Sequence, residues 1–181
     1  MTEPADITII SRVKGGDTNS YGRLIEKYQE SLFVMILNMI KSPETAEDIV
    51  QDVFFAAYRH LKTFDPSKGK FSTWLFQIAR NRCRNELKRR KEKGMPDMEE
   101  HPSGHNPAAD LIKKEMFKAL DRALHELPFR QKAVFVLSEI QGLSLAEISR
   151  IEKRPVGTIK SRLFRAKKKL RSQLNAYTRK K

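Results

Sequence analysis

The stretch SLAEISRIEKRPVGTIKSRLFRAKKKLRSQL, residues 144–174, contains a short capped segment, a proline and a long basic segment. Ser144 is followed three residues later by Glu147, which is the spacing of a capping box, so a helix is predicted to begin there. A turn is expected before Pro155, and a second helix is predicted from Val156. A short helix, a turn and a second helix at this spacing predict a helix-turn-helix motif.

The second of these helices is predicted to have an apolar side and a cationic side. With about 3.6 residues per turn, one stripe is apolar and is expected to be core; it consists of Ile159, Leu163, Ala166, Leu170 and Leu174. The opposite face is formed by Ser161, Phe164, Arg165, Lys168 and Ser172. Such a helix suits the major groove of DNA. A solvated basic helix, or an arm that binds RNA without sequence preference, remains an alternative.

Helical patterns extend over the rest of the chain. No segment shows the sustained alternation of apolar and polar residues that strands require. Helices are predicted for residues 5–14, 17–41, 43–62, 71–93, 109–127 and 128–142. Residues 94–107 are rich in glycine, proline and polar side chains, a composition typical of a linker. We therefore expect an all-α protein of two small helical domains, residues 1–93 and 110–181, each with a modest core and joined by a flexible linker at 94–109.

The charge of the chain points to polyanionic partners. Lys and Arg number 36 against 22 Asp and Glu, giving a net charge of +14 and a pI near 10.0. The excess is concentrated in residues 80–93 and 153–181, while the remaining chain is mildly acidic. Basic segments of this kind bind phosphates, and the acidic remainder suggests a partner of a different class.

Composition argues against secretion, metal binding and catalysis. Cys83 is the only cysteine, which excludes an intrachain disulfide, and no signal peptide or span of ~20 apolar residues is visible. Cys83 with His101 and His105 would give a metal at most three ligands, so neither a metal nor another cofactor is expected. No nucleophile and base, catalytic carboxylate pair or phosphate loop emerges. We expect a soluble cytoplasmic protein that is not an enzyme.

The helix predicted at 43–62 carries an aromatic residue on its outer side. Its buried side is predicted to be Ala46, Ile49, Val50, Val53, Phe54, Ala57 and Leu61. The outer side then carries Phe55 among Asp48, Gln51 and Asp52. An exposed aromatic ring with a charged rim is typical of a protein-docking surface. The alternative is that the N-terminal helix covers Phe55.

Aromatic residues also crowd the segment from Phe64 onwards. Phe64, Phe71, Trp74 and Phe76 surround the loop at 65–70. Further along the predicted helix, Trp74, Asn81, Asn85 and Lys88 share one face. Rings that stack on unpaired bases beside cations that follow the backbone are what single-stranded DNA binding requires. Because most aromatic residues are core, the hypothesis depends on Trp74 and the loop.

Three ordered motifs resemble the extracytoplasmic function sigma factors of bacteria. They are AEDIVQDVF at 46–54, FSTWL with IARN at 71–81, and PVGTIKSRLFRA at 155–166. The resemblance spans nearly the whole chain. It implies an alternative sigma factor that binds core RNA polymerase and directs transcription initiation. The first domain would recognise and melt the minus-10 element of promoter DNA, and the second would read the minus-35 element.

The resemblance also implies roles for individual residues. The β′ clamp helices of the polymerase would be contacted by Asp48, Gln51, Asp52 and Phe55, and the β flap would be a further contact of the chain. Minus-10 DNA would be bound by Phe64, Asp65, Lys70, Ser72, Trp74, Asn81, Arg84, Asn85 and Lys88. Minus-35 DNA would be bound by Thr158, Lys160, Ser161, Arg162, Phe164, Arg165 and Lys168. An anti-sigma factor is a further expected partner, because members of the family are commonly inhibited by one.

One departure from the family and two rival functions remain. Asp52 stands where the family often has Glu. The negative charge is the same, but the side chain is shorter. A helix-turn-helix regulator that acts without polymerase is the first rival, with residues 1–93 as a sensing or dimerising domain. The second is a cationic adaptor bound to membranes or RNA. Neither rival requires the acidic face with Phe55 or the aromatic loop.

Overall fold

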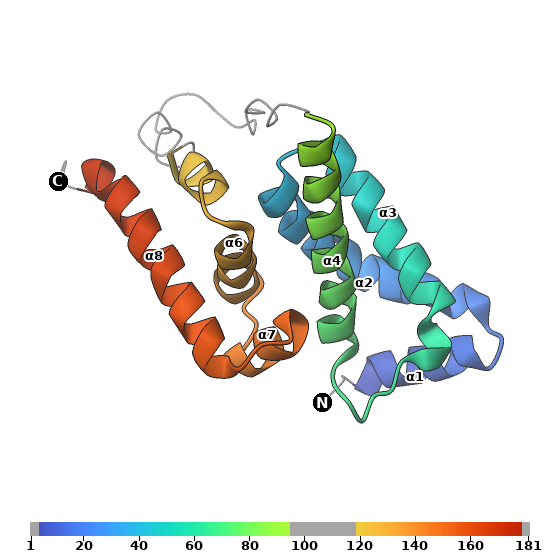
Figure 1. The fold of residues 1–181 in the computed structure, drawn as a ribbon. Coiled ribbons are helices and arrows are strands. Elements are labelled where there is room, and N and C mark those ends of the chain that lie inside the picture. Colours follow the sequence, from blue (N-terminus) through green and yellow to red (C-terminus); the bar gives the residue numbers. More distant parts are fainter. Residues whose placement is uncertain (1–3, 95–118, 179–181) are drawn as a thin grey trace, which may run out of the picture.

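The computed structural model describes residues 4–94 and 119–178, and within these ranges every regular element is a helix (Figure 1). The first part contains α1 (Pro4–Lys14), η1 (Thr18–Ser20), α2 (Tyr21–Ile40), α3 (Pro43–Arg59), η2 (Leu61–Thr63) and α4 (Phe71–Glu92). The second contains a helical stretch at 119–125, α6 (Phe129–Phe135), η3 (Val136–Ile140), α7 (Leu145–Glu152) and α8 (Val156–Thr178). The predicted all-α class is confirmed.

Local signals fix several of the helix boundaries. The hydroxyl of Ser42 accepts a hydrogen bond from the Thr45 backbone N–H at 3.1 Å, so it caps α3, and Pro43 fills the first turn. Ser144 and Glu147 form the predicted reciprocal capping box of α7. Both helices therefore begin where the sequence placed them.

Two helices end differently from the prediction. The helix expected over 43–62 ends at Arg59, and a 3₁₀ turn, η2, completes the segment. The helix expected over 128–142 turns at Val136 into the π-helical η3, in which the Gln141 N–H donates to the Val136 carbonyl at 3.0 Å. The linker predicted at 94–109, and most of the helix predicted at 109–127, lie outside the described residues.

The apolar core runs across the two halves of the chain. Helices α2, α3 and α4 bury large side chains such as Leu32, Met35 and Phe71. The same cluster continues into Leu137 and Ile159 of the second half, and a smaller separate cluster joins residues 119–127 to α8. The described residues thus form two clusters, and the larger one includes residues of both halves because α4 and α7 pack against each other.

The sequence predicts neither a membrane span nor a metal site. In the described ranges, no helix is long and apolar enough to cross a bilayer. The same residues hold no cluster of three or more His, Cys, Asp or Glu side chains that could bind a metal ion. His101 and His105 lie outside the described residues. Cys83 is fully buried, and burial raises the pKa of its thiol to about 12.

Candidate polymerase and DNA interfaces

The outer face of α3 presents Phe55 to solvent. Its ring is 63% exposed, and the guanidinium of Arg59 lies 5.6 Å from the ring centre. Asp48, Gln51 and Asp52 are exposed on the same face. The alternative that the N-terminal helix covers Phe55 is therefore wrong. The pattern found in the sequence is the surface seen in the structure, an apolar anchor with an acidic rim.

An apolar groove lies beside this face, between α2 and α3. It has a volume of about 680 Å³, and its lining includes Tyr21, Ile25, Val50, Phe54, Phe55 and Tyr58. The Tyr21 hydroxyl donates a 2.7 Å hydrogen bond to the Phe54 carbonyl, and burial raises the pKa of this phenol. The groove adjoins the residues that the sequence singled out, and Gln51 and Phe55 are part of its lining.

The loop after Phe64 is anchored by an aromatic cluster. Phe64 is only 6% exposed and packs edge-to-face on Phe71, with 5.5 Å between the ring centres. Trp74 covers it, with 5.4 Å between the centres, and is itself half-buried. Phe64 therefore lies inside the cluster, and Trp74 is the more accessible of these three rings.

The loop itself is shaped by Asp65. Its Oδ1 accepts hydrogen bonds from the Ser67 N–H at 3.0 Å and the Ser67 hydroxyl at 2.7 Å. These hydrogen bonds lower the pKa of the Asp65 carboxyl below its ordinary value. A carboxylate that is occupied in this way has a local role, holding the turn that leads to Lys70.

The predicted minus-10 face of α4 changes character along the helix. Ser72, Trp74 and Asn81 are half-buried, whereas Arg84, Asn85 and Lys88 are exposed. The structure therefore divides the predicted set into a half-buried part in the first half of α4 and an exposed part further along the helix.

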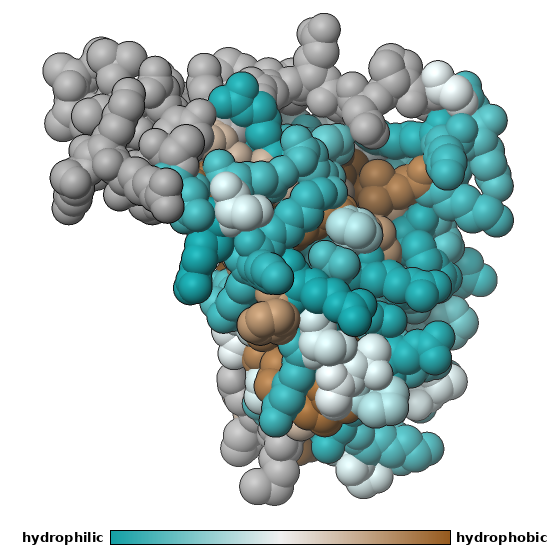
Figure 2. Space-filling model, turned by 60° about the vertical axis from the view of Figure 1, so that its left-hand side comes forward, coloured by the Kyte–Doolittle hydropathy of each residue, from teal (hydrophilic) through white to brown (hydrophobic). Residues whose placement is uncertain are grey.

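The outer face of α8 is open along the predicted stripe. Phe164 is 68% exposed, and Lys160, Ser161, Arg165 and Lys168 are exposed around it. Figure 2 shows that hydrophilic side chains cover most of this side of the molecule. Of the predicted core stripe, Ile159, Ala166 and Leu170 are buried and Leu163 and Leu174 are half-buried. Thr158 is half-buried, and its carbonyl accepts a hydrogen bond from Ser161.

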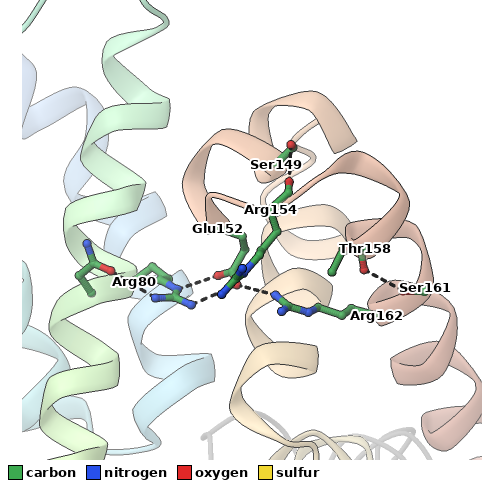
Figure 3. A network of polar contacts seen from close by, with 8 residues as sticks. Arg80, Ser149, Glu152, Arg154, Thr158, Ser161 and Arg162 are labelled. Atoms are coloured by element: carbon green, nitrogen blue, oxygen red, sulfur yellow. Dashed lines mark hydrogen bonds and ion pairs between the residues drawn. The ribbon is translucent and has the colours of Figure 1, made fainter.

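Arg162 differs from its neighbours on α8. Its side chain is 14% exposed and turns back toward α7, where Nη1 donates to Oε2 of Glu152 at 3.0 Å (Figure 3). Arg80 of α4 reaches the same carboxylate from the other side, at 2.6 Å from Nε and 3.0 Å from Nη2. Among the residues predicted to bind minus-35 DNA, Arg162 thus pairs with a buried carboxylate of α7.

Helix α7 forms two ion pairs with the first half of the chain. Besides the Arg80–Glu152 pair, Lys70 Nζ lies 2.8 Å from Oε1 of Glu147. Burial by itself would raise the pKa of the Glu147 carboxyl, but hydrogen bonds from Lys70 and Ser144 outweigh it and lower the value to about 2. Elsewhere between the two halves, Lys41 at the end of α2 pairs with Asp121 of the helical stretch at 119–125, at 2.8 Å. Figure 1 shows α7 between α8 and the beginning of α4.

Sequence reasoning missed Arg80 and Glu152 as functional residues. Arg80 was noted in the basic stretch at 80–93 and in the IARN motif, but it was given no role of its own. The position of Glu152 in the last turn of α7 could have drawn attention to it. A carboxylate there is destabilised by the negative end of the helix dipole and needs a cationic partner. That partner is distant in sequence, so periodicity could not identify it.

Known proteins resemble the chain over nearly its whole length. Residues 24–93 match the family Sigma-70 region 2, and residues 117–170 match Sigma-70 region 4. The "ECF RNA polymerase sigma factor SigW" of Bacillus subtilis is 31% identical, covering 91% of this chain and 94% of the relative.

Two solved structures share the fold. CnrH, solved in complex with the cytosolic domain of CnrY, superposes with a TM-score of 0.73 at 24% identity, over 95% of this chain and 98% of that chain. The sigma factor RpoE of Bartonella quintana, solved with the anti-sigma factor NepR, superposes with a TM-score of 0.69 at 25% identity. That match covers 86% of this chain and 96% of RpoE.

Proposed function

The chain belongs to the ECF RNA polymerase sigma factors, and from this premise we propose which of its surfaces bind the polymerase and which bind promoter DNA. As an alternative sigma factor, it directs transcription by RNA polymerase. Sigma factors are non-catalytic regulatory subunits. A helix-turn-helix regulator that acts without polymerase has no support, because region 2 accounts for residues 24–93, where that rival needs a sensing domain.

The α3 face is the proposed docking surface for the β′ clamp helices. The exposed Phe55 ring supports this assignment more than any other observation, because a 63% exposed aromatic side chain costs solvation unless a partner covers it. Asp48, Gln51 and Asp52 surround the ring and supply charge that can steer a basic partner.

Asp52→Arg tests the docking surface. The Asp52 side chain is 60% exposed and lies 3.4 Å from Arg82, itself 45% exposed, so reversal of its charge leaves the core intact. We expect affinity for core polymerase to fall at least ~10-fold in a pull-down, with an unchanged far-ultraviolet circular dichroism spectrum. Glu30→Arg makes the same charge change on the exposed side of α2 and is the control. Equal loss in both variants would refute the assignment.

Promoter DNA is proposed to bind two separate cationic surfaces. The loop after Phe64, with Trp74 and the basic end of α4, would hold the unpaired minus-10 strand. The open face of α8 around Phe164 and Arg165 would enter the major groove of the minus-35 element. Run-off transcription with core polymerase on a promoter library tests both surfaces together. Absence of any initiation by the wild-type protein would refute the proposed function.

An anti-sigma factor is a proposed further partner. RpoE of Bartonella quintana was solved with the anti-sigma factor NepR, and the present chain shares its fold. Its apolar groove between α2 and α3 is the surface best suited to such an inhibitor, since it adjoins the proposed polymerase site. Proteins that copurify with this chain should then block its binding to core polymerase. If none of them blocks binding, the proposal is wrong.

A further inference from the structure

Helix α1 (Pro4–Lys14) belongs to none of the proposed polymerase and DNA surfaces. It lies before both segments that match the sigma-factor regions, 24–93 and 117–170. In the structure it packs on α2 and reaches η2, where the chain passes from α3 to α4 (Figure 1). The loop at 65–70 begins directly after η2 and Phe64. The N-terminal helix is therefore a neighbour of the loop proposed to receive an unpaired base.

The position of α1 is fixed by a buried carboxylate. Asp6 is 2% exposed, and its two oxygens accept hydrogen bonds from the Tyr28 hydroxyl at 2.6 Å and the Lys27 ammonium group at 2.8 Å. Ile10 and Val13 add buried apolar contacts in the larger core cluster. Since a carboxylate removed from water is stable only with such partners, α1 is held in one place on α2.

Two connections run from α1 to Phe64. The first is a series of rings: Tyr28, which binds Asp6, packs on Phe71 with 5.8 Å between the ring centres, and Phe71 packs on Phe64. The second is direct, because Lys14 Nζ donates a 2.7 Å hydrogen bond to the Phe64 carbonyl oxygen, 50 residues away in the sequence. A lysine in the last turn of a helix is favourable through the helix dipole alone, but this acceptor lies outside the helix.

The Phe64 carbonyl is the point where the loop starts. Because a peptide unit is planar, holding this oxygen also orients the Asp65 N–H at the beginning of the loop. Beyond that point the loop is organised from within: the Lys68 N–H donates to the Asp65 carbonyl at 3.1 Å, and Ser67 binds the Asp65 carboxylate. Lys14 therefore ties a locally closed turn to α1.

We propose that Lys14 is a positioning residue for the minus-10 loop: by holding the Phe64 carbonyl, it keeps the loop at 65–70 in the conformation that receives the flipped base. This inference rests on the proposed function, since it assumes that the loop binds unpaired minus-10 DNA. Lys14 acts without touching DNA. Its loss raises the free-energy cost of ordering the loop, which weakens binding of the base and leaves phosphate contacts on α4 unchanged.

Lys14→Met in the holoenzyme tests this role. The probes are fluorescent single strands with the minus-10 sequence of a promoter transcribed in the run-off assay, either intact or with an abasic site at one position, scanned along the element. We expect Lys14→Met to bind the intact strand about 5-fold more weakly than the wild type, because a charge-assisted hydrogen bond is lost. On the strand that lacks the flipped base, the two proteins should bind equally. Lys14→Arg keeps a charged donor and should restore affinity to within about twofold.

Arg12→Met is the matched control. It removes one positive charge from an exposed position two residues earlier, and residues at this spacing lie on nearly opposite sides of a helix. Its affinity for every strand should stay within about twofold of the wild type, as for most surface substitutions. Equal weakening of intact and abasic strands by Lys14→Met would make Lys14 a phosphate contact and would overturn the proposal.

Trp74 supplies a measurement that does not depend on DNA. It is the only tryptophan of the chain, and its ring centre lies 5.4 Å from that of Phe64. Acrylamide quenching of its fluorescence should increase for Lys14→Met and stay at the wild-type level for Lys14→Arg and Arg12→Met, with circular dichroism unchanged. Unchanged quenching in Lys14→Met would also overturn the proposal, since the loop would then keep its order without the hydrogen bond.

Failure of the proposed function gives a different result. Wild-type holoenzyme would then bind the intact strand and every abasic strand alike, because no base enters the loop. Discrimination by the wild type, combined with no effect of Lys14→Met, refutes the role of Lys14 alone.

Discussion

The two proposed DNA surfaces have similar cations but opposite surroundings. On α8, the side chains of Lys160, Arg165 and Lys168 project from an open face, and within residues 4–94 and 119–178 none of them pairs with a carboxylate. Near the start of α4, Lys70 and Arg80 are each paired with a glutamate of α7. The proposed duplex-DNA surface is thus open, whereas Lys70 and Arg80 are occupied by glutamates.

This difference suggests an order of events at a promoter. An exposed cationic face can be attracted to phosphates from a distance and needs no rearrangement. Cations that are paired with glutamates would have to exchange those partners before they bind phosphates, which lowers the apparent affinity for DNA. We therefore expect minus-35 contacts to precede minus-10 contacts.

The largest expected effect is a loss of stability when a buried side chain on the inner side of α8 is shortened. Ile159 is fully buried on the inner side of α8, so Ile159→Ala should lower the free energy of unfolding by about 2–5 kcal/mol. Urea denaturation monitored by circular dichroism measures this free energy. Val156→Ala, at a 38% exposed position of the same helix, should change stability by only about 0.5 kcal/mol. Similar losses for both would mean that α8 is not held by its apolar stripe.

Two arginines of α8 test whether the exposure of a side chain determines which residue contacts DNA bases. Arg165 is exposed, so Arg165→Ala should weaken minus-35 binding by about 1–3 kcal/mol and alter sequence preference. Arg162 is bound to Glu152, so Arg162→Ala should cost less in the same electrophoretic mobility shift assay. A larger effect at Arg162, or equal losses on all DNA sequences at Arg165, would contradict the comparison.

Lys168 should contribute through charge alone. It is exposed beyond the N-terminal turns of α8, where a side chain reaches phosphates and not base edges. Lys168→Ala should weaken binding to all sequences alike and reduce the slope of log affinity against log salt by about 1. Titrations at several salt concentrations measure it. An unchanged slope with altered sequence preference would place Lys168 at a base.

The smallest expected effect is a weaker contact between α7 and α4 at acidic pH. Because the pKa of Glu147 is lowered from 4.5 to about 2 in the folded protein, its contribution to stability is complete above about pH 4.5 and is lost as the pH falls toward 2. Its partners there are Lys70 and Ser144, so closure of α7 on α4 should weaken over this range. Scattering between pH 5 and 3 should report a rising radius of gyration, with a shallower rise for Glu147→Gln.

Much of the local structure could be predicted because its causes are local. The cap of α3 at Ser42 and the capping box of Ser144 depend on groups only three residues apart. The exposed position of Phe55 follows from helical periodicity, because Phe55 lies on the side of α3 opposite its buried residues. The π-helical turn at Val136 and the end of α3 at Arg59 were missed, because backbone details at helix ends carry weak sequence signals.

By itself the sequence determined the helices, the apolar stripes and the three motifs that carry the family, because these depend on neighbours within a few turns. Only the tertiary structure decided that Arg80 and Arg162 share the carboxylate of Glu152, and that α7 packs on α4 while the outer face of α8 stays exposed. The Arg80–Glu152 contact joins side chains 72 residues apart. Periodicity gives the face on which a side chain lies, but packing selects the partner that it meets.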